Sequence, residues 1–350
     1  MAPLTASVVV ATRNRLSALE MSLPLLLKQT RLPQEIVVVD SSDDHAPVAA
    51  LVARLAAGSP VPLRLIHSAP GGALQRNLGR QAISGDVVIF PDDDSLFFPE
   101  AIAAVMRIYE LDRDGVVAGV AAGATARSPL EDPSAGVAAT YAAKRQRLPA
   151  RLLAGAFLYA ERHLIRSPFN LLREEIVRRK TLPPAIAAAG GQLAADQEGF
   201  RMSFRTAMLG PAPFNEALTL YALGEDKDLC YGLPERTIIV ELTGDHVRHH
   251  EFPGARQGGF RRGFTEVLNQ AYIVCRHTLP GDRARRGFWP YFLLLGVQIL
   301  LRSASRYQRA RLAGYLRAMW LLRRLDRAPA SDLDARYRQI IARHLAPPGA

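Results

Sequence analysis

The sequence predicts an α/β fold, in which helices cover a mostly parallel, Rossmann-like central sheet. Apolar segments of strand length alternate with segments of helical periodicity through the first part of the chain. The strand segments are continuous apolar runs, which is typical of parallel strands that are buried on both faces. With 350 residues, of which 49% are hydrophobic, the chain is long enough for a large core.

The clearest elements lie at the start of the chain, where β-branched apolar runs predict strands and leucine- or alanine-rich segments predict helices. In chain order, these strands and helices are Ser7–Ala11, Leu16–Gln29, Glu35–Val39, Pro47–Ala57, Leu63–His67, Ala73–Ser84, Val87–Phe90 and Pro99–Leu111. Further strands are expected at Val116–Ala122, Phe200–Ala207 and Thr237–Leu242. A further helix is expected to begin near residue 224.

The remaining segments predict additions to this sheet. Residues 128–195 are rich in alanine, arginine and leucine, so we expect a helical insertion that shapes an acceptor site or serves packing alone. The predicted organisation is a sheet domain over residues 1–250, with this insertion, and a C-terminal helical appendage over residues 251–350.

The net charge of +11 is concentrated near the C-terminus, because Asp282 is the only acid between Arg276 and Leu325. The arginines of this stretch flank the apolar run Phe288–Leu301. Aromatic and aliphatic residues beside arginines are what an anionic membrane surface attracts, so we predict membrane association and no nucleic-acid partner. A buried helical pair that packs on the first domain is the alternative.

The absence of several sequence features indicates the cellular compartment. The two cysteines are far apart, and the first residues lack the basic and apolar stretches of a secretory signal. No segment has the length and hydropathy of a membrane span. We therefore expect a cytoplasmic protein that is peripheral at the inner face of the cell membrane.

Three consecutive aspartates, Asp92 to Asp94, follow the predicted strand Val87–Phe90 and one proline. Neighbouring carboxylates repel one another, so a cation is needed to offset their charge. Ligands of open α/β sheets gather at the carboxyl ends of the strands. This position favours a divalent metal that carries a diphosphate over a solvated acidic turn.

Several motifs occur in an order that resembles a known family. They are SVVVATRNR from Ser7, IVVVDSSD from Ile36, GALQRNLG from Gly72, FPDDD from Phe90, FNE from Phe214 and GEDKDL from Gly224. The series covers roughly residues 5 to 235 and resembles the family 2 glycosyltransferases of the GT-A fold. The resemblance implies inverting transfer of a sugar from a nucleoside-diphosphate donor.

The resemblance also implies a role for each cluster. The donor would be bound by Thr12, Arg13, Asp40, Arg76, Asp92 and Asp93. The metal, Mg²⁺ or Mn²⁺, would be held by Asp94, with Asp92 and His246 as further ligands. Carboxylate oxygens suit such hard ions, and guanidinium groups suit a diphosphate. Asp226 matches the catalytic base that deprotonates the acceptor hydroxyl; an acid that merely interacts with a helix dipole is the alternative.

The predicted function is transfer of one sugar to a membrane-associated glycan or glycolipid in bacterial envelope or exopolysaccharide synthesis. Processive polysaccharide synthases carry a Gln-x-x-Arg-Trp signature, whereas this chain has QGGFRR from Gln257, which favours single-sugar transfer. Two alternatives stay open. One is a catalytically inactive nucleotide-binding scaffold of a glycan assembly complex. The other is a nucleotidyltransferase, which usually has a glycine-rich phosphate loop where this chain has Thr12–Arg15.

Overall fold

The computed structural model describes residues 3–130, 159, 165–218, 224–252, 258–301, 303 and 305–345. The chain divides into two compact units. The sheet unit comprises Met1–Gly136 and Arg179–Gly254, and the helical unit comprises Val137–Arg178 and Ala255–Ala350.

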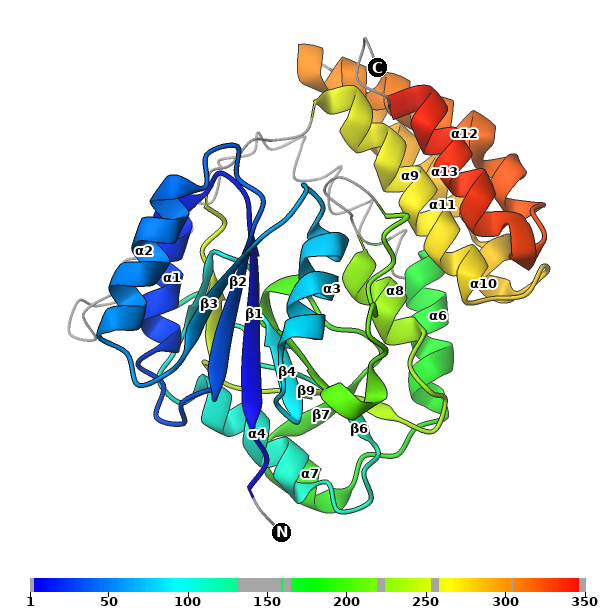
Figure 1. Ribbon diagram of the computed structural model, residues 1–350. Coiled ribbons are helices and arrows are strands. Elements are labelled where there is room, and N and C mark those ends of the chain that lie inside the picture. Colours follow the sequence, from blue (N-terminus) through cyan, green and yellow to red (C-terminus); the bar gives the residue numbers. More distant parts are fainter. Residues whose placement is uncertain are drawn as a thin grey trace. The chain divides into compact units, whose positions relative to one another are not determined.

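An eight-stranded sheet in the order β3-β2-β1-β4-β8-β6-β9-β7 forms the sheet unit (Figure 1). Its strands are β1 (Ala6–Thr12), β2 (Glu35–Asp40), β3 (Leu63–His67), β4 (Val87–Phe90), β6 (Val117–Ala121), β7 (Gly191–Ala194), β8 (Met202–Arg205) and β9 (Ile238–Leu242). Strands β1 to β4 are parallel, as are β6 and β9. Strands β7 and β8 run antiparallel to their neighbours. The predicted α/β fold with a mostly parallel sheet is confirmed.

Helices cover both faces of this sheet, and this explains the continuous apolar runs. One core lies against α1 (Leu16–Leu26), α2 (Ala46–Ala57) and α4 (Ala101–Leu111). The other lies against α3 (Gly72–Ala82) and α8 (Glu225–Tyr231). Successive residues of a strand point to opposite faces. Val8 and Val10 of β1 therefore enter the first core and Val9 enters the second.

Parts of the sheet unit differ from the sequence prediction. The end of the expected helical insertion contains the short helix α7 (Pro184–Ala188) and then β7, which is a strand of the central sheet. Two short strands that the sequence did not predict, β5 (Ser95–Phe97) and β10 (Val247–His249), form a separate antiparallel pair. The expected strand at Phe200–Ala207 is reduced to β8, because its first and last residues form single 3₁₀ turns. Residues 131–158 and 160–164 of the expected insertion lie outside the described residues.

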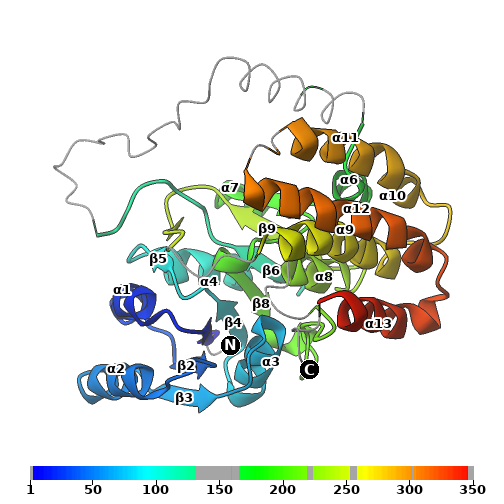
Figure 2. The ribbon, with the colours of Figure 1, turned by 90° about the horizontal axis from the view of Figure 1, so that it is seen from above.

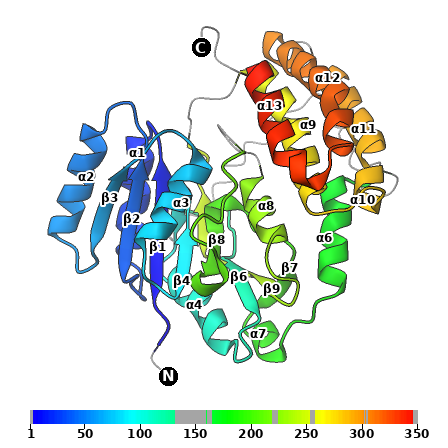
Figure 3. The same cartoon turned by 45° about the vertical axis from the view of Figure 1, so that its right-hand side comes forward.

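The helical unit contains α6 (Pro168–Arg178), α9 (Gly259–Arg276), α10 (Arg283–Arg286), α11 (Phe288–Leu301), α12 (Arg306–Asp326) and α13 (Leu333–Leu345). Figures 2 and 3 show α9 and α12 packed side by side, with α11 and α13 beside them. Glycines make the close α9–α12 contact: a Cβ atom on Gly263 or Gly314 would lie 2.0 Å from a backbone oxygen of the partner helix. No helix in the described part of the chain has both the length and the hydropathy needed to cross a membrane.

Candidate active site

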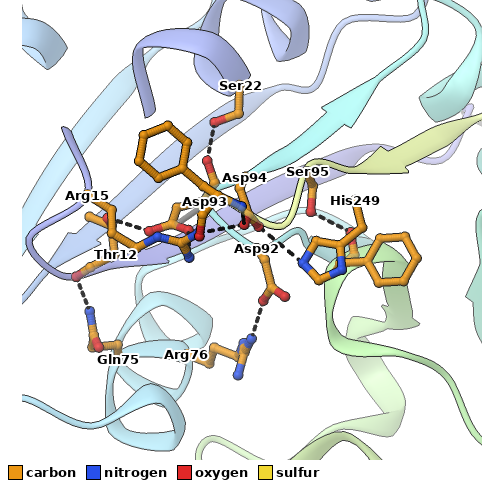
Figure 4. A network of polar contacts seen from close by, with 12 residues as sticks. Thr12, Arg15, Ser22, Gln75, Arg76, Asp92, Asp93, Asp94, Ser95 and His249 are labelled. Atoms are coloured by element: carbon orange, nitrogen blue, oxygen red, sulfur yellow. Dashed lines mark hydrogen bonds and ion pairs between the residues drawn. The ribbon is translucent and has the colours of Figure 1, made fainter. Parts of the chain in front are cut away.

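The acidic triplet lies between β4 and β5, at the carboxyl end of the parallel strands (Figure 4). A β-bridge joins Asp92 to Ala11 of β1, so the triplet is tied to the centre of the sheet. The side chains of Asp93 and Asp94 are buried, whereas that of Asp92 is 31% exposed. The three neighbouring acids therefore have different surroundings.

Arg15 is the main counter-charge of the buried pair. Its guanidinium nitrogens lie 2.6 Å from Oδ1 of Asp93 and 2.5 Å from Oδ2 of Asp94, and it also donates to the carbonyl oxygen of Phe252. The preceding residue, Asn14, has a φ of 53°, a left-handed conformation that asparagine tolerates better than most residues. From the sequence, Arg13 was predicted as a donor-binding residue and no role was predicted for Arg15. The structure places Arg13 outward, where it pairs with Asp43.

Asp93 is held from the interior by the surrounding strands and helices. The hydroxyl of Thr12 donates to Oδ2 of Asp93 at 2.8 Å, and the hydroxyl of Ser22 donates to its backbone oxygen. Burial raises the pKa of Asp93 to about 7, although Arg15 opposes this shift. These contacts direct Asp93 toward the protein and leave the outer two aspartates to face a ligand.

Asp92, Asp94 and His249 form a group that could hold a metal ion, since their ligand atoms all lie within 4.8 Å of one another. Nε2 of His249 lies 3.3 Å from Oδ1 of Asp94, and no hydrogen bond between described residues reaches this buried oxygen. Burial alone would raise the pKa of Asp94, but His249 and Arg15 hold it well below its usual range. Carboxylate oxygens suit Mn²⁺ or Mg²⁺, and imidazole is a common ligand of divalent transition metals. The residues present therefore fit a divalent metal.

The histidine of this group is His249, and His246 lies elsewhere. Nδ1 of His246 accepts a hydrogen bond from the backbone N–H of Gly123, and burial lowers the pKa of His246. His249 belongs to β10, where it pairs with Ser95 of β5, and its ring stacks on Phe200 with 4.7 Å between centroids. The pairing of β5 with β10 determines which of the neighbouring histidines lies beside the aspartates, and these three-residue strands were not predicted from the sequence.

Arg76 of α3 links the triplet to the start of α8. One guanidinium nitrogen lies 2.7 Å from Oδ1 of Asp92 and the other lies 2.5 Å from Oε1 of Glu225. The arginine is buried, so these two ion pairs are sheltered from water. Sequence reasoning found Arg76 and missed Glu225, which adjoins the predicted base.

Asp226 lies in the first turn of α8, after Gly224 with a φ of 100° that favours glycine. Oδ2 of Asp226 accepts from the backbone N–H of Gly199 at 3.1 Å, and Oδ1 accepts from that of Lys227 at 2.8 Å. A Cβ atom built on Gly199 would lie 3.7 Å from Oδ1 of Asp92, so Gly199 lies between the two aspartates. Burial raises the pKa of Asp226 above that of an ordinary carboxyl group.

Asp40 ends β2 and is fully buried. Its Oδ1 accepts from the backbone N–H and the hydroxyl of Ser42, and its Oδ2 lies 2.7 Å from Nδ1 of His45. The backbone N–H of Ser41 donates to the carbonyl oxygen of Thr12, so the ends of β1 and β2 are joined. Gln75, which sequence reasoning did not assign, donates to the carbonyl oxygens of Thr12 and Val39 and completes this corner.

Part of the chain is similar in sequence to known proteins. Residues 7–171 match the family described as Glycosyl transferase family 2. The uncharacterized glycosyltransferase YwdF of Bacillus subtilis is 33% identical over 105 residues, which are 30% of this chain and 38% of that protein. An uncharacterized glycosyltransferase of Haemophilus influenzae is 29% identical over 104 residues, which are 30% of this chain and 34% of that protein. The matches thus span little more than a third of these relatives.

Solved structures include two similar chains. The mannosyltransferase PcManGT of Pyrobaculum calidifontis, in complex with GDP-Man and Mn²⁺, gives a TM-score of 0.47 at 16% identity, over 99% of this chain and 89% of that chain. TarS of S. aureus gives 0.42 at 16% identity, over 96% of this chain and 55% of that chain. Residues 7–171 of this chain are thus similar to glycosyl transferase family 2 proteins, and both named relatives are described as glycosyltransferases.

Proposed function

We propose that the chain is an inverting, metal-dependent glycosyltransferase that moves one sugar from a nucleoside-diphosphate donor to a membrane-associated acceptor. The observation that carries the proposal is the convergence of two acidic groups from distant parts of the sequence. Arg76 bridges Asp92 and Glu225, and Gly199 lies between Asp92 and Asp226. Asp92 of the proposed metal group therefore lies near Asp226, the candidate base.

In this proposal Asp92, Asp94 and His249 hold Mg²⁺ or Mn²⁺. The bound ion would offset the negative charge that grows on the departing nucleoside diphosphate. Arg76, which faces Asp92, supplies positive charge on the same side. Arg15 and Thr12 fix Asp93, and through it the position of the whole triplet.

Asp226 acts as the general base on the acceptor side. A raised pKa suits this role, since a stronger base accepts a proton from a hydroxyl group more readily. The two backbone N–H groups that bind its carboxylate fix its orientation. Attack from this side, opposite the leaving diphosphate, would invert the anomeric configuration.

The nucleoside is proposed to bind at the ends of β1 and β2, against Thr12, Arg13 and Asp40. Asp40 is fully buried and its two oxygens are held by Ser42 and His45, so a base or ribose would reach this carboxylate by displacing the exposed ring of His45. Arg13 is 46% exposed and paired only at the surface with Asp43, so it can turn toward a donor at little cost.

A membrane-associated acceptor is supported by the exposed face of α11. Leu293, Val297, Leu300 and Leu301 are each more than half exposed and recur at helical spacing. Helix α11 has 14 residues and is therefore about 21 Å long, too short for a hydrocarbon core of about 30 Å. Such a helix fits the interface of a bilayer, so we propose a peripheral position at the inner face of a bacterial membrane and a lipid-linked or polysaccharide acceptor.

Thermal-shift measurements on the purified protein with UDP, GDP or dTDP, each with and without Mn²⁺, test the donor half of the proposal. We expect at least one nucleotide to stabilise the protein only with Mn²⁺, and its sugar derivative to be hydrolysed or transferred. Asp94→Asn should lose this metal-dependent shift, whereas the exposed Asp114→Asn should keep it. If no nucleotide shifted the wild-type protein in the presence of metal, the proposed donor class would be wrong.

A further inference from the structure

Arginines supply three of the six side chains that line one cavity in the helical unit. Its volume is about 190 Å³, and its walls are Arg324, Arg336, Gln339, Ile340, Arg343 and His344. We call it the arginine pocket. None of these six residues carries a carboxylate, so the pocket is positively charged at neutral pH.

Two helices build the arginine pocket. Arg336, Ile340 and Arg343 of α13 are four and three residues apart, so they lie along one face of that helix. Arg324 comes from the last turn of α12, which packs against α13. The three arginines are exposed, and Ile340 is buried.

Several other arginines of the helical unit have acidic partners. Arg311 contacts Glu266, Arg276 contacts Asp334, and Arg285 lies 3.9 Å from Asp326. Within the described residues, no ion pair joins Arg324, Arg336 or Arg343 to a carboxylate. Three like charges around one cavity repel one another, so an anion that entered it would relieve this repulsion.

The pKa of His344 is affected by the same positive charges. Partial burial, together with the charges of Arg317, Arg324 and Arg343, lowers the pKa of His344. Its imidazole is therefore mostly neutral at neutral pH and can offer an N–H donor without adding to the repulsion. Guanidinium forks with a neighbouring imidazole match the geometry and charge of a phosphate group.

The pocket adjoins an exposed apolar surface. The guanidinium of Arg324 lies 5.1 Å from the ring centroid of Trp320, and that of Arg317 lies 4.6 Å from it. Trp320 is 59% exposed, and Leu316, one turn earlier on α12, is 58% exposed. Tryptophan is enriched at the headgroup level of membranes, where its ring is partly in lipid and partly in water.

We propose that the arginine pocket binds the phosphate of an anionic lipid headgroup, while Trp320 and Leu316 enter the adjoining lipid layer. The proposal gives the membrane association above a defined recognition site and rests on that association, but it needs no catalytic step. A free phosphate or pyrophosphate has the same binding chemistry as the headgroup. Only the lipid would also use the apolar surface.

Co-sedimentation of the full-length protein with vesicles tests the proposal, using phosphatidylcholine alone and phosphatidylcholine mixed with phosphatidic acid. Binding should require phosphatidic acid. Arg336→Gln/Arg343→Gln should lower vesicle affinity by about thirtyfold, because each arginine near an anionic surface raises the affinity by a factor of about five. Arg107→Gln/Arg113→Gln is the matched control, since it removes the same charge from exposed positions of the sheet unit, away from both the pocket and α11 in sequence. An equal loss in both variants, or none in the pocket variant, would overturn the proposal.

Two further measurements are needed. One distinguishes a lipid phosphate from a free phosphate, and the other distinguishes this proposal from the proposed transferase activity. Trp320→Ala should weaken vesicle binding and leave the binding of inorganic pyrophosphate, measured calorimetrically with EDTA present, unchanged. If free pyrophosphate bound as tightly as the vesicles and Trp320→Ala had no effect on either, the ligand would be a soluble phosphate and the lipid assignment would be wrong. The Mn²⁺-dependent nucleotide shift of the pocket variant should equal that of the wild type, so failure of the pocket and failure of the proposed transferase activity are distinguishable.

Discussion

Asparagine at position 226 tests the assignment of the base, because Asp226→Asn removes proton acceptance while preserving shape. In the structure the two carboxylate oxygens accept one backbone hydrogen bond each, from Gly199 and from Lys227. An asparagine oxygen can keep one of these bonds, and its NH₂ group then faces the other N–H. We expect a loss of stability of about 1–3 kcal/mol for the unpaired donor.

The catalytic loss should be much larger than this local effect. General base catalysis contributes about 10²–10⁴-fold, which corresponds to about 2.7–5.4 kcal/mol of activation free energy. Donor binding should stay near the wild-type value, because the metal group Asp92, Asp94 and His249 is unchanged. The expected signature is therefore a fall in kcat for sugar transfer without a comparable change in the nucleotide Kd.

The assay measures release of nucleoside diphosphate with and without acceptor, alongside the nucleotide Kd in Mn²⁺. Asp114→Asn, an exposed acid-to-amide change on the sheet unit, controls for the loss of charge. Transfer by Asp226→Asn at the wild-type rate would refute the base assignment. An equal loss of donor binding and transfer would instead show that Asp226 positions the donor.

Four further outcomes are expected. Asp94→Asn should abolish Mn²⁺-dependent nucleotide binding in calorimetry, because it removes the buried oxygen that lies near His249; retained binding would remove Asp94 from the metal group. His249→Ala should weaken the apparent Mn²⁺ affinity by about tenfold or more, whereas His246→Ala should not; the reverse result would restore His246 as the ligand. Gly79→Ala should destabilise the protein by about 1–3 kcal/mol in denaturant titration, since its Cβ would lie 2.2 Å from Cγ1 of Val9, whereas Gly58→Ala has open space and should be nearly neutral; equal effects would contradict the packing argument. Because burial raises the pKa of Asp226, and only its deprotonated form acts as a base, the rate of sugar transfer should fall as the pH decreases, with an apparent pKa above the 3.8 of an ordinary aspartate. A pH-rate profile whose acid limb has an apparent pKa at or below 3.8 would contradict this.

The sheet could be predicted because its physical cause is local. Val8–Val10 and Ile36–Val39 read as solid apolar runs since each strand supplies two cores, and both runs form parallel strands of the sheet. Asp40 and the acidic triplet follow such strands directly, so strand ends alone indicated where polar side chains would collect. Strand β8 was predicted within the longer range Phe200–Ala207, whereas β7 was not predicted, because it has four residues and its place in the sheet depends on its pairing with β9.

The site residues that escaped prediction depend on contacts between distant segments. Arg15 is chosen over Arg13 by the turn at Asn14, whose backbone conformation the sequence does not state. His249 is chosen over His246 by the pairing of β10 with β5, which is a contact across about 150 residues. Glu225 becomes important only because Arg76 reaches it from α3.

The position of the middle aspartate explains how one fold tolerates three adjacent acids. Asp93 and Asp94 are the central residues of a turn, which is closed by a hydrogen bond from the backbone N–H of Ser95 to the carbonyl oxygen of Asp92. Asp93 turns toward Thr12 and Arg15, and burial with a raised pKa reduces its charge. Asp92 is compensated separately by Arg76. Only Asp94 keeps a buried oxygen without a hydrogen bond from any described residue, so the attraction for a cation is concentrated at that atom instead of being spread over the triplet.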